Sequence, residues 1–204
     1  MLTGHSYYFI THWRIPGACG EVADILSDPL ALPRWWPSVY LDVVELQPPD
    51  ANGLNRRVRL RTKGFLPYTL GWNFTVVESR YPHRYAIVAD GDFEGRGVWT
   101  IEQDGPFVVV TYDWRVAARK PLLRNLSFLL RPIFEANHRW AMAQGQTSLM
   151  LELARRRVTS ETARAKIPPP PGPVTYAGIA LVTGAAVVAG ALTYLIVRSR
   201  RRKR

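Results

Sequence analysis

The chain has 204 residues, of which 47% are hydrophobic and 21% charged, enough for one domain with a sizeable core and unlike a disordered chain. Its net charge is +11, but six of its 27 basic residues lie within positions 198–204. Residues 1–166 therefore carry a net charge of only +5, and the sequence predicts no nucleic-acid partner. Cys19 is the only cysteine, which excludes an internal disulfide and a cysteine-based zinc site.

Hydrophobic periodicity predicts a single α+β domain over residues 1–160. A strand over 6–15 is followed by a short helix over 19–27, and the prolines within 30–39 allow only a short, interrupted helical turn. Six further strands and one long helix then complete the domain. The strands are expected at 40–47, 54–63, 68–79, 84–90, 93–103 and 107–117, and the helix at 125–157, broken near its start by Pro132.

Alternation within the strands predicts which side chains face the core. Glycines beside a tryptophan, as in 93–103, are typical of a strongly bent sheet that makes room on its concave face. The expected inward residues are Val58 and Leu60, then Trp72, Phe74 and Val76, then Gly95, Gly97, Trp99 and Ile101, and finally Val108, Val110, Tyr112, Trp114 and Val116.

Two further patterns concern the faces of the long helix and of the strand over 54–63. The long helix carries an apolar stripe that we expect to pack inward, namely Leu126, Leu129, Ile133, Trp140 and Met150. The strand over 54–63 points a basic row outward, made of Arg57, Arg59, Arg61 and Lys63. A solvated outer face is the favoured interpretation of that row, and attraction to anionic lipid is the alternative.

The C-terminal part of the chain predicts a membrane anchor. Residues 161–173 form a proline-rich linker, which favours an extended spacer. Residues 174–197 contain no charge, and a helix of that length spans about 36 Å, enough to cross a hydrocarbon core of about 30 Å. The basic tail 198–204 then ends the span. We therefore expect a single-pass membrane protein with a C-terminal anchor.

The orientation of that anchor follows from the N-terminus. No basic segment followed by a long apolar run opens the chain, so no signal peptide is predicted and the soluble domain is expected in the cytoplasm. Five basic residues precede the span and six follow it, so charge alone does not set the orientation. Nothing in the sequence indicates an oligomeric state.

Few residues carry recognisable catalytic chemistry. Metal-binding, nucleotide-binding and serine-hydrolase motifs are absent, so no cofactor and no metal are predicted. His83 follows a proline in a turn and is expected to be exposed, while His5 and His12 lie at the ends of the first strand. Asn137 and His138 lie on the long helix, where one of them is placed to face a cavity.

The order of these elements resembles the START-like superfamily of polyketide cyclases/dehydrases and lipid-transfer proteins (SRPBCC type). Segments 15–29 and 35–39 look like its first helix and tryptophan-proline segment, 95–101 and 110–114 like its sixth and seventh strands, and 137–142 like its closing helix. The resemblance covers about residues 5–157. It implies a helix-grip fold, in which a curved antiparallel sheet of about seven strands wraps the C-terminal helix around a cavity.

Members of that superfamily bind sterols, phospholipids, quinones or polyketides, and many are not catalysts. Together with the predicted anchor, the resemblance predicts a membrane-tethered binder of a hydrophobic small molecule such as a lipid, isoprenoid, quinone or polyketide, in an aromatic-lined cavity. The expected ligand-binding residues are Arg34, Trp35, Trp72, Trp99, Tyr112, Trp114, Asn137 and His138.

Two alternatives remain open. The first is an enzyme of the cyclase or dehydratase type, in which His138 or Asp113 acts as acid or base. The second is a protein-interaction module whose cavity is vestigial. Dependence on one acid or base residue favours the enzyme, and a cavity filled by the protein's own side chains favours the interaction module.

Overall fold

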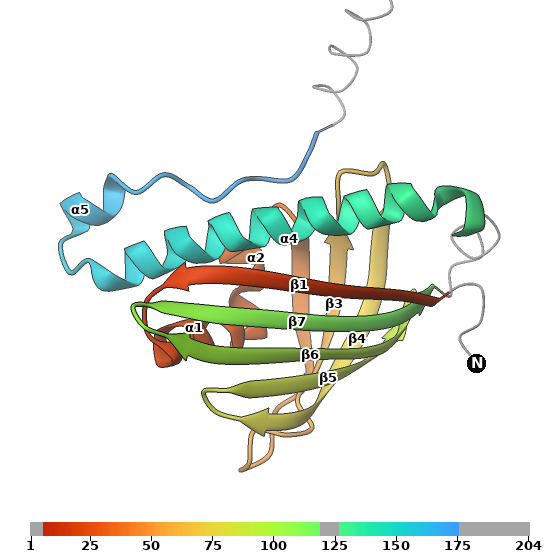
Figure 1. The fold of residues 1–204 in the computed structure, drawn as a ribbon, viewed down its shortest axis with the longest axis horizontal. Coiled ribbons are helices and arrows are strands. Elements are labelled where there is room, and N and C mark those ends of the chain that lie inside the picture. Colours follow the sequence, from red (N-terminus) through yellow and green to blue (C-terminus); the bar gives the residue numbers. More distant parts are fainter. Residues whose placement is uncertain (1–5, 119–126, 176–204) are drawn as a thin grey trace, which may run out of the picture. The chain divides into compact units, whose positions relative to one another are not determined.

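Seven antiparallel strands form one sheet in the order β1-β7-β6-β5-β4-β3-β2 (Figure 1). The computed structural model describes residues 6–118 and 127–175. Strands β2 to β7 pair with their neighbours along the chain, and β1 returns to pair with β7, so β1 and β2 are the sheet edges. The strands are β1 (Ser6–Pro16), β2 (Tyr40–Gln47), β3 (Arg57–Lys63), β4 (Thr69–Arg80), β5 (Arg84–Gly91), β6 (Phe93–Asp104) and β7 (Phe107–Ala118).

Short helices follow the first strand, as expected. These are α1 (Cys19–Leu26), the 3-10 helix η1 (Pro29–Ala31) and α2 (Leu32–Trp35). At the start of α1, the Glu21 carboxylate accepts a hydrogen bond from the Ala18 backbone N–H at 2.9 Å, because the first amides of a helix lack helical partners. The same carboxylate binds Arg157 at 2.7 Å, which ties α1 to the far end of the chain's long helix.

The long helix α4 (Ser127–Arg157) crosses the concave side of the sheet (Figure 1). The α+β helix-grip prediction is therefore confirmed for the domain. Pro132 lies within α4 without ending it, so the expected break does not occur. Pro132 is the sixth residue of α4, beyond the first turn where proline is readily tolerated, so the helix continues past it at the cost of one backbone hydrogen bond.

The predicted apolar stripe of α4 is wrong at two of its positions. Ile133 is 42% exposed and Met150 is 39% exposed, whereas Met142, Leu149 and Leu153 are buried. The buried face also holds small or polar residues, namely Gly145, Ser148 and Glu152. A hydrophobicity pattern does not detect such positions. Leu126 and the Leu129 side chain lie outside the described part of the structure.

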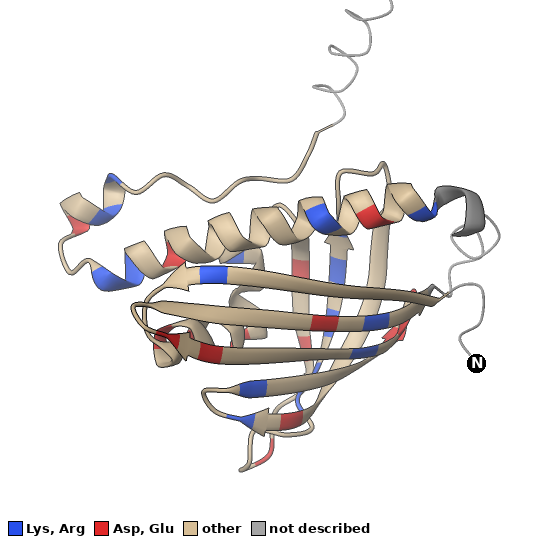
Figure 2. Cartoon of the chain, viewed as in Figure 1, with Lys and Arg blue, Asp and Glu red and all other residues tan. Residues whose placement is uncertain are grey.

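The strand faces follow the expected alternation. Val58, Leu60 and Ile101 are at most 1% exposed, and the inward residues of β7 are all buried. The basic row belongs to the opposite face of β3, where Arg59 and Arg61 are exposed. Figure 2 marks the basic positions of that strand in blue. Arg57 binds Asp90 of β5 at 2.9 Å, as is usual on a solvated outer face.

The C-terminal segment differs in part from the expectation. A short helix, α5 (Glu161–Ala165), lies inside the predicted linker. Within the described residues, no helix combines the length and hydrophobicity needed to cross a membrane. The predicted span 174–197 and the tail 198–204 lie outside the described residues, except for Val174 and Thr175.

Candidate functional site

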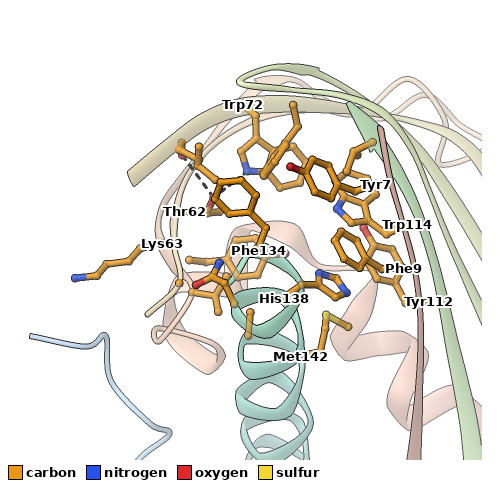
Figure 3. A pocket seen from close by; sticks show the side chains of 18 of the residues that line it. Tyr7, Phe9, Thr62, Lys63, Trp72, Tyr112, Trp114, Phe134, His138 and Met142 are labelled. Atoms are coloured by element: carbon orange, nitrogen blue, oxygen red, sulfur yellow. Dashed lines mark hydrogen bonds between the residues drawn. The ribbon is translucent and has the colours of Figure 1, made fainter. Parts of the chain in front are cut away.

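A cavity of about 140 Å³, here called the first chamber, lies between the inner face of the sheet and the first half of α4. Figure 3 shows the rings of Tyr7, Trp72 and Trp114 arranged around it, with Phe134 and His138 of α4 on the other side. Its wall consists of Tyr7, Phe9, Trp36, Val39, Tyr40, Thr62, Lys63, Gly64, Tyr68, Leu70, Trp72, Phe93, Tyr112, Trp114, Val116, Phe134, Asn137, His138, Ala141 and Met142.

The glycine at position 97 makes room for this aromatic wall. A Cβ atom there would lie 2.7 Å from the Tyr112 hydroxyl and 2.9 Å from the Trp114 ring, closer than side chains approach. The ring centroids of Tyr112 and Trp114 lie 5.7 Å apart in a stacked arrangement above that gap. The expectation that glycines of this strand leave space for large rings is therefore confirmed at Gly97.

A buried hydrogen-bond chain fixes Trp72 in the wall. Its indole Nε1 donates to the Thr62 hydroxyl at 3.0 Å, and that hydroxyl donates to the Leu70 carbonyl at 3.5 Å. Both partners are needed because a buried polar group without a partner costs about 1–3 kcal/mol. These hydrogen bonds hold the Trp72 indole in its place in the wall.

On the α4 side, His138 is enclosed by aromatic and polar neighbours. Its ring stacks on Phe9 with centroids 4.1 Å apart, and its Nε2 lies 3.4 Å from the Thr11 hydroxyl. Burial, with a smaller contribution from the charge of Arg139, lowers the pKa of His138 to about 4. The imidazole is therefore neutral at physiological pH.

Phenol groups supply most of the remaining polar atoms. Burial raises the pKa of Tyr68 to about 12, with a smaller effect from Tyr7, and burial likewise raises the pKa values of Tyr40 and Tyr112 above the usual range. All four phenols line the chamber and stay uncharged. They can donate or accept hydrogen bonds without creating a buried charge.

Asn137 has a structural contact in addition to its place in the wall. Its Oδ1 accepts a hydrogen bond from the Phe65 backbone N–H at 2.9 Å. A Cβ atom at Gly64 would lie 2.0 Å from the same oxygen, so glycine permits the close approach of the β3–β4 loop to α4. Asn137 thus holds this loop beside the first chamber.

A second chamber of about 200 Å³ lies against the other end of the sheet. It shares four wall residues with the first chamber: Trp36, Tyr40, Trp72 and Tyr112. Its remaining wall consists of Leu26, Ser27, Pro29, Leu32, Pro49, Gly53, Arg56, Phe74, Val76, Ser79, Tyr85, Ile87 and Trp99.

The structure brings most of the predicted site residues together. Five of them line the first chamber, and Trp99 lines the second; those in the first are Trp72, Tyr112, Trp114, Asn137 and His138. That these side chains contact a ligand stays a prediction.

Arg34 and Trp35 line neither chamber, which corrects the expectation for both. Trp35 is fully buried against Trp36, with ring centroids 5.4 Å apart. Arg34 points to the protein surface, where its guanidinium binds both carboxylate oxygens of Glu152 at 2.8 and 2.9 Å. Its role is to neutralise a buried carboxylate of α4.

Asp113 is also wrong as a candidate acid or base inside the cavity. It lies on the outer face of β7, where its carboxylate binds Arg115 at 2.9 Å and lies 3.5 Å from the Tyr8 hydroxyl. Adjacent strand residues point to opposite faces, so Asp113 is turned away from its neighbours Tyr112 and Trp114.

Sequence reasoning missed several wall residues. Tyr7 and Phe9 of β1 share a strand face with the buried Trp13 and Ile15, so alternation was the signal that could have found them. Trp36 takes the position expected for its neighbour Trp35. In the described part of the chain, no group of three or more His, Cys, Asp or Glu side chains is arranged to hold a metal ion.

Solved structures share this fold. TTHA0849 from Thermus thermophilus is 15% identical, with a TM-score of 0.61 over 74% of this chain and 100% of that one. The Zhui aromatase/cyclase from Streptomyces sp. R1128 is 16% identical, with a TM-score of 0.59 over 77% and 99%. The di-domain ARO/CYC BexL from the BE-7585A biosynthetic pathway is 14% identical, with a TM-score of 0.55 over 72% and 50%. At these identities the likeness concerns the fold alone.

No curated protein matches the chain. A family model described as polyketide cyclase / dehydrase and lipid transport matches residues 13–156, which is most of the chain. That match, together with the helix-grip fold and its aromatic chamber, shows that the chain belongs to the polyketide cyclase/dehydrase and lipid transport family.

Proposed function

We propose that this protein binds a hydrophobic small molecule, of the lipid, isoprenoid, quinone or polyketide class, in the first chamber. The observation that carries the proposal is the composition of the wall: aromatic rings, uncharged phenols and a neutral imidazole, with Lys63 as the one charged side chain among the described wall residues. Among the described residues, no carboxylate lines either chamber. Apolar pockets with a few oriented polar groups are typical of small-molecule sites.

The aromatic wall suits such a ligand energetically. Each Å² of apolar surface removed from water contributes about 25 cal/mol, and rings that are already fixed lose little conformational entropy on binding. Trp72 is fixed by Thr62, and Tyr112 lies stacked on Trp114. A preformed site of this kind selects ligands that fit its shape and that need few hydrogen bonds.

A cyclase or dehydratase activity is the second candidate, and His138 favours it. The imidazole borders the chamber in its neutral form, which is the form that can accept a proton from a bound molecule. Its low pKa makes it a weak base at neutral pH, and no carboxyl group accompanies it among the wall residues described. Binding without turnover is therefore the better supported function.

The vestigial-cavity alternative receives less support. Side chains leave an open volume of about 140 Å³ in the first chamber rather than filling it. A well-packed interior contains few voids larger than a water molecule.

We also propose, from the sequence alone, that residues 174–197 anchor the chain in a membrane and that 161–173 act as the linker. The ligand-binding domain, residues 1–160, then lies on the cytoplasmic side. An anchor of this kind keeps the domain at a high local concentration over the bilayer, where hydrophobic ligands reside. Protease protection in sealed vesicles tests this arrangement, because cytoplasmic exposure makes the domain accessible from that side only.

The proposed binding is tested by filling the first chamber. Ala141 lines it, whereas Ala143 lies two positions further along α4 and is exposed. We expect native mass spectrometry of the purified full-length protein to detect a co-purifying hydrophobic molecule in the wild type and in Ala143→Trp, but not in Ala141→Trp. Equal loading of both variants would contradict binding in this chamber.

A further inference from the structure

Neither chamber alone is large enough for the proposed ligand. Pockets for drug-sized molecules measure about 300–1,000 Å³, and an engineered cavity of about 150 Å³ holds benzene. The first chamber, at about 140 Å³, is thus suited to a single ring, and the second measures about 200 Å³. Only the two volumes together reach the lower end of the range for a lipid or isoprenoid.

The chambers are separated by a partition of four rings, Trp36, Tyr40, Trp72 and Tyr112, and three of these are held in place. Trp72 donates its hydrogen bond to Thr62 at 3.0 Å. Tyr112 is stacked between two rings, with its centroid 3.9 Å from that of Trp99 and 5.7 Å from that of Trp114. Movement of either ring would break a buried hydrogen bond or a stacking contact.

Trp36 is fixed by the helix. A Cβ atom at Gly145 of α4 would lie 2.3 Å from the Trp36 ring, so the indole already touches the helix backbone surface. Trp13 packs against its other side, with centroids 5.7 Å apart. The ring is 2% exposed, and the contacts with the helix and with Trp13 hold it in place.

Tyr40 differs from the other three. It begins β2, an edge strand, and its pairing with β3 shifts register between Tyr40 and Asp42. Burial alone raises the pKa of its phenol, with no hydrogen bond contributing among the described residues, and its ring meets Trp36 edge-on, with centroids 5.1 Å apart. Turning this side chain aside therefore breaks the fewest contacts.

We propose that the two chambers form one binding site for an elongated, flexible apolar chain, such as an acyl or polyprenyl chain, and that the Tyr40 ring is the gate between them. This inference rests on the proposed function. A chain one methylene wide passes through the opening left by a single ring. A rigid fused-ring molecule would require Trp36, Trp72 or Tyr112 to move as well.

The length dependence of binding tests the joined site. Octanol, dodecanol and hexadecanol serve as probes, and the tryptophan fluorescence of the full-length protein reports binding. Val76 lines the second chamber, and the next residue, Val77, is 43% exposed. Each buried methylene raises affinity about fourfold. We expect Val76→Phe to weaken hexadecanol binding about tenfold or more and to leave octanol unchanged, while Val77→Phe changes neither.

Association kinetics test the gate. We expect Tyr40→Ala to raise the association rate of hexadecanol severalfold more than that of octanol, because only the longer alcohol has to pass between the chambers. Tyr40→Phe keeps the ring and removes only the hydroxyl, so it serves as the matched control and should resemble the wild type. Equal acceleration of both alcohols by Tyr40→Ala would show that the ring gates entry to the protein and not passage between chambers.

Different results would contradict binding in the first chamber and the joining of the two chambers. If octanol binds and Ala141→Trp abolishes its binding, the first chamber is a ligand site. If Val76→Phe then weakens all three alcohols equally or none of them, the joined site is wrong while the proposed function stands. If no alcohol binds the wild type saturably, the proposed function itself loses its support.

Discussion

The two halves of α4 differ in how closely they are packed: the second half lies in a dense part of the core, and the first half borders an open chamber. In the second half, Gly145 touches the ring of Trp36, which follows α2, and Leu149 is fully buried, so the helix is closely packed there. In the first half, Phe134 and His138 border the open first chamber. The comparison indicates that one half of the helix supplies stability, which allows the other half to leave a void.

A void of this kind is costly unless packing elsewhere offsets it, because atoms around it lose their contacts. The packed half also contains a charge cluster. Glu152 is buried, and although burial opposes ionisation, hydrogen bonds from Arg34 and Arg156 outweigh it and lower the pKa of Glu152. This cluster secures the C-terminal half of α4 against α2.

The largest expected loss of stability comes from a substitution in the packed second half of α4. We expect Leu149→Ala to lower the free energy of unfolding by about 2–5 kcal/mol, the usual range for a fully buried leucine. Phe134→Ala removes a larger side chain, yet it should cost less, because that ring already borders open volume. Urea denaturation of both variants measures the difference. A larger loss for Phe134→Ala would mean that the first half is packed in solution.

The next effect concerns the pH dependence of the open half. The pKa of His138 falls from 6.5 to about 4 on folding, so the unfolded chain binds a proton that the folded protein does not. Stability from the neutral imidazole is therefore fully present above pH 6.5 and declines as the pH falls toward 4, by up to about 3 kcal/mol.

Replacing His138 by glutamine isolates this contribution. We expect the stability of the wild type to fall relative to His138→Gln as the pH decreases from 6.5 to 4, measured by urea denaturation at a series of pH values. Carboxylates titrate equally in both proteins over this range. Parallel curves for the two proteins would mean that the imidazole is solvated rather than buried in the folded state.

A smaller loss of stability is expected from a substitution that tests the contact between Gly145 and the Trp36 ring. Gly145→Ala adds a Cβ that would lie 2.3 Å from the Trp36 ring, and overpacking typically costs about 1–3 kcal/mol. Alanine gains about 1 kcal/mol in helix propensity over glycine, so a net loss of about 1–2 kcal/mol is expected. Ala143→Gly at the exposed neighbouring position measures the propensity term by itself. If Gly145→Ala stabilises the protein, the close contact between α4 and Trp36 is absent.

The same comparison explains what the sequence could predict. Strand alternation correctly placed Trp72, Tyr112 and Trp114 inward, because a period of two leaves only two faces to choose between. The α4 stripe failed, since the buried face of the helix includes Gly145 and Glu152. Gly145 can be buried because it is small, and Glu152 because it is paired with arginines. A hydrophobicity pattern detects neither property.

Trp35 and Trp36 show a second limit of sequence reasoning. They are adjacent in an irregular segment where α2 ends, so no period indicates which ring faces the chamber. The volumes of the chambers were equally beyond prediction, because they depend on how closely side chains from α4 and several separate strands approach one another. Sequence patterns record which residues are present and not the space left between them.

The smallest expected effect on stability lies beside the first chamber. Asn137→Ala removes the acceptor of the Phe65 N–H, which should cost about 1 kcal/mol. Asn137→Asp is the matched control, because its carboxylate oxygen can accept the same hydrogen bond. Hydrogen exchange distinguishes the two: we expect the Phe65 amide to exchange faster in Asn137→Ala and at the wild-type rate in Asn137→Asp.

Binding should respond to the same change more strongly than stability does. The β3–β4 loop approaches α4 closely at Gly64 and Asn137, whose Oδ1 lies 2.0 Å from the position of a Cβ at residue 64. Without that contact the loop can open beside the chamber, so dissociation of a bound dodecanol molecule should accelerate severalfold in Asn137→Ala. Stopped-flow fluorescence on displacement measures this rate. An unchanged rate, together with faster Phe65 exchange, would assign Asn137 to stability alone and place ligand release at another part of the chamber wall.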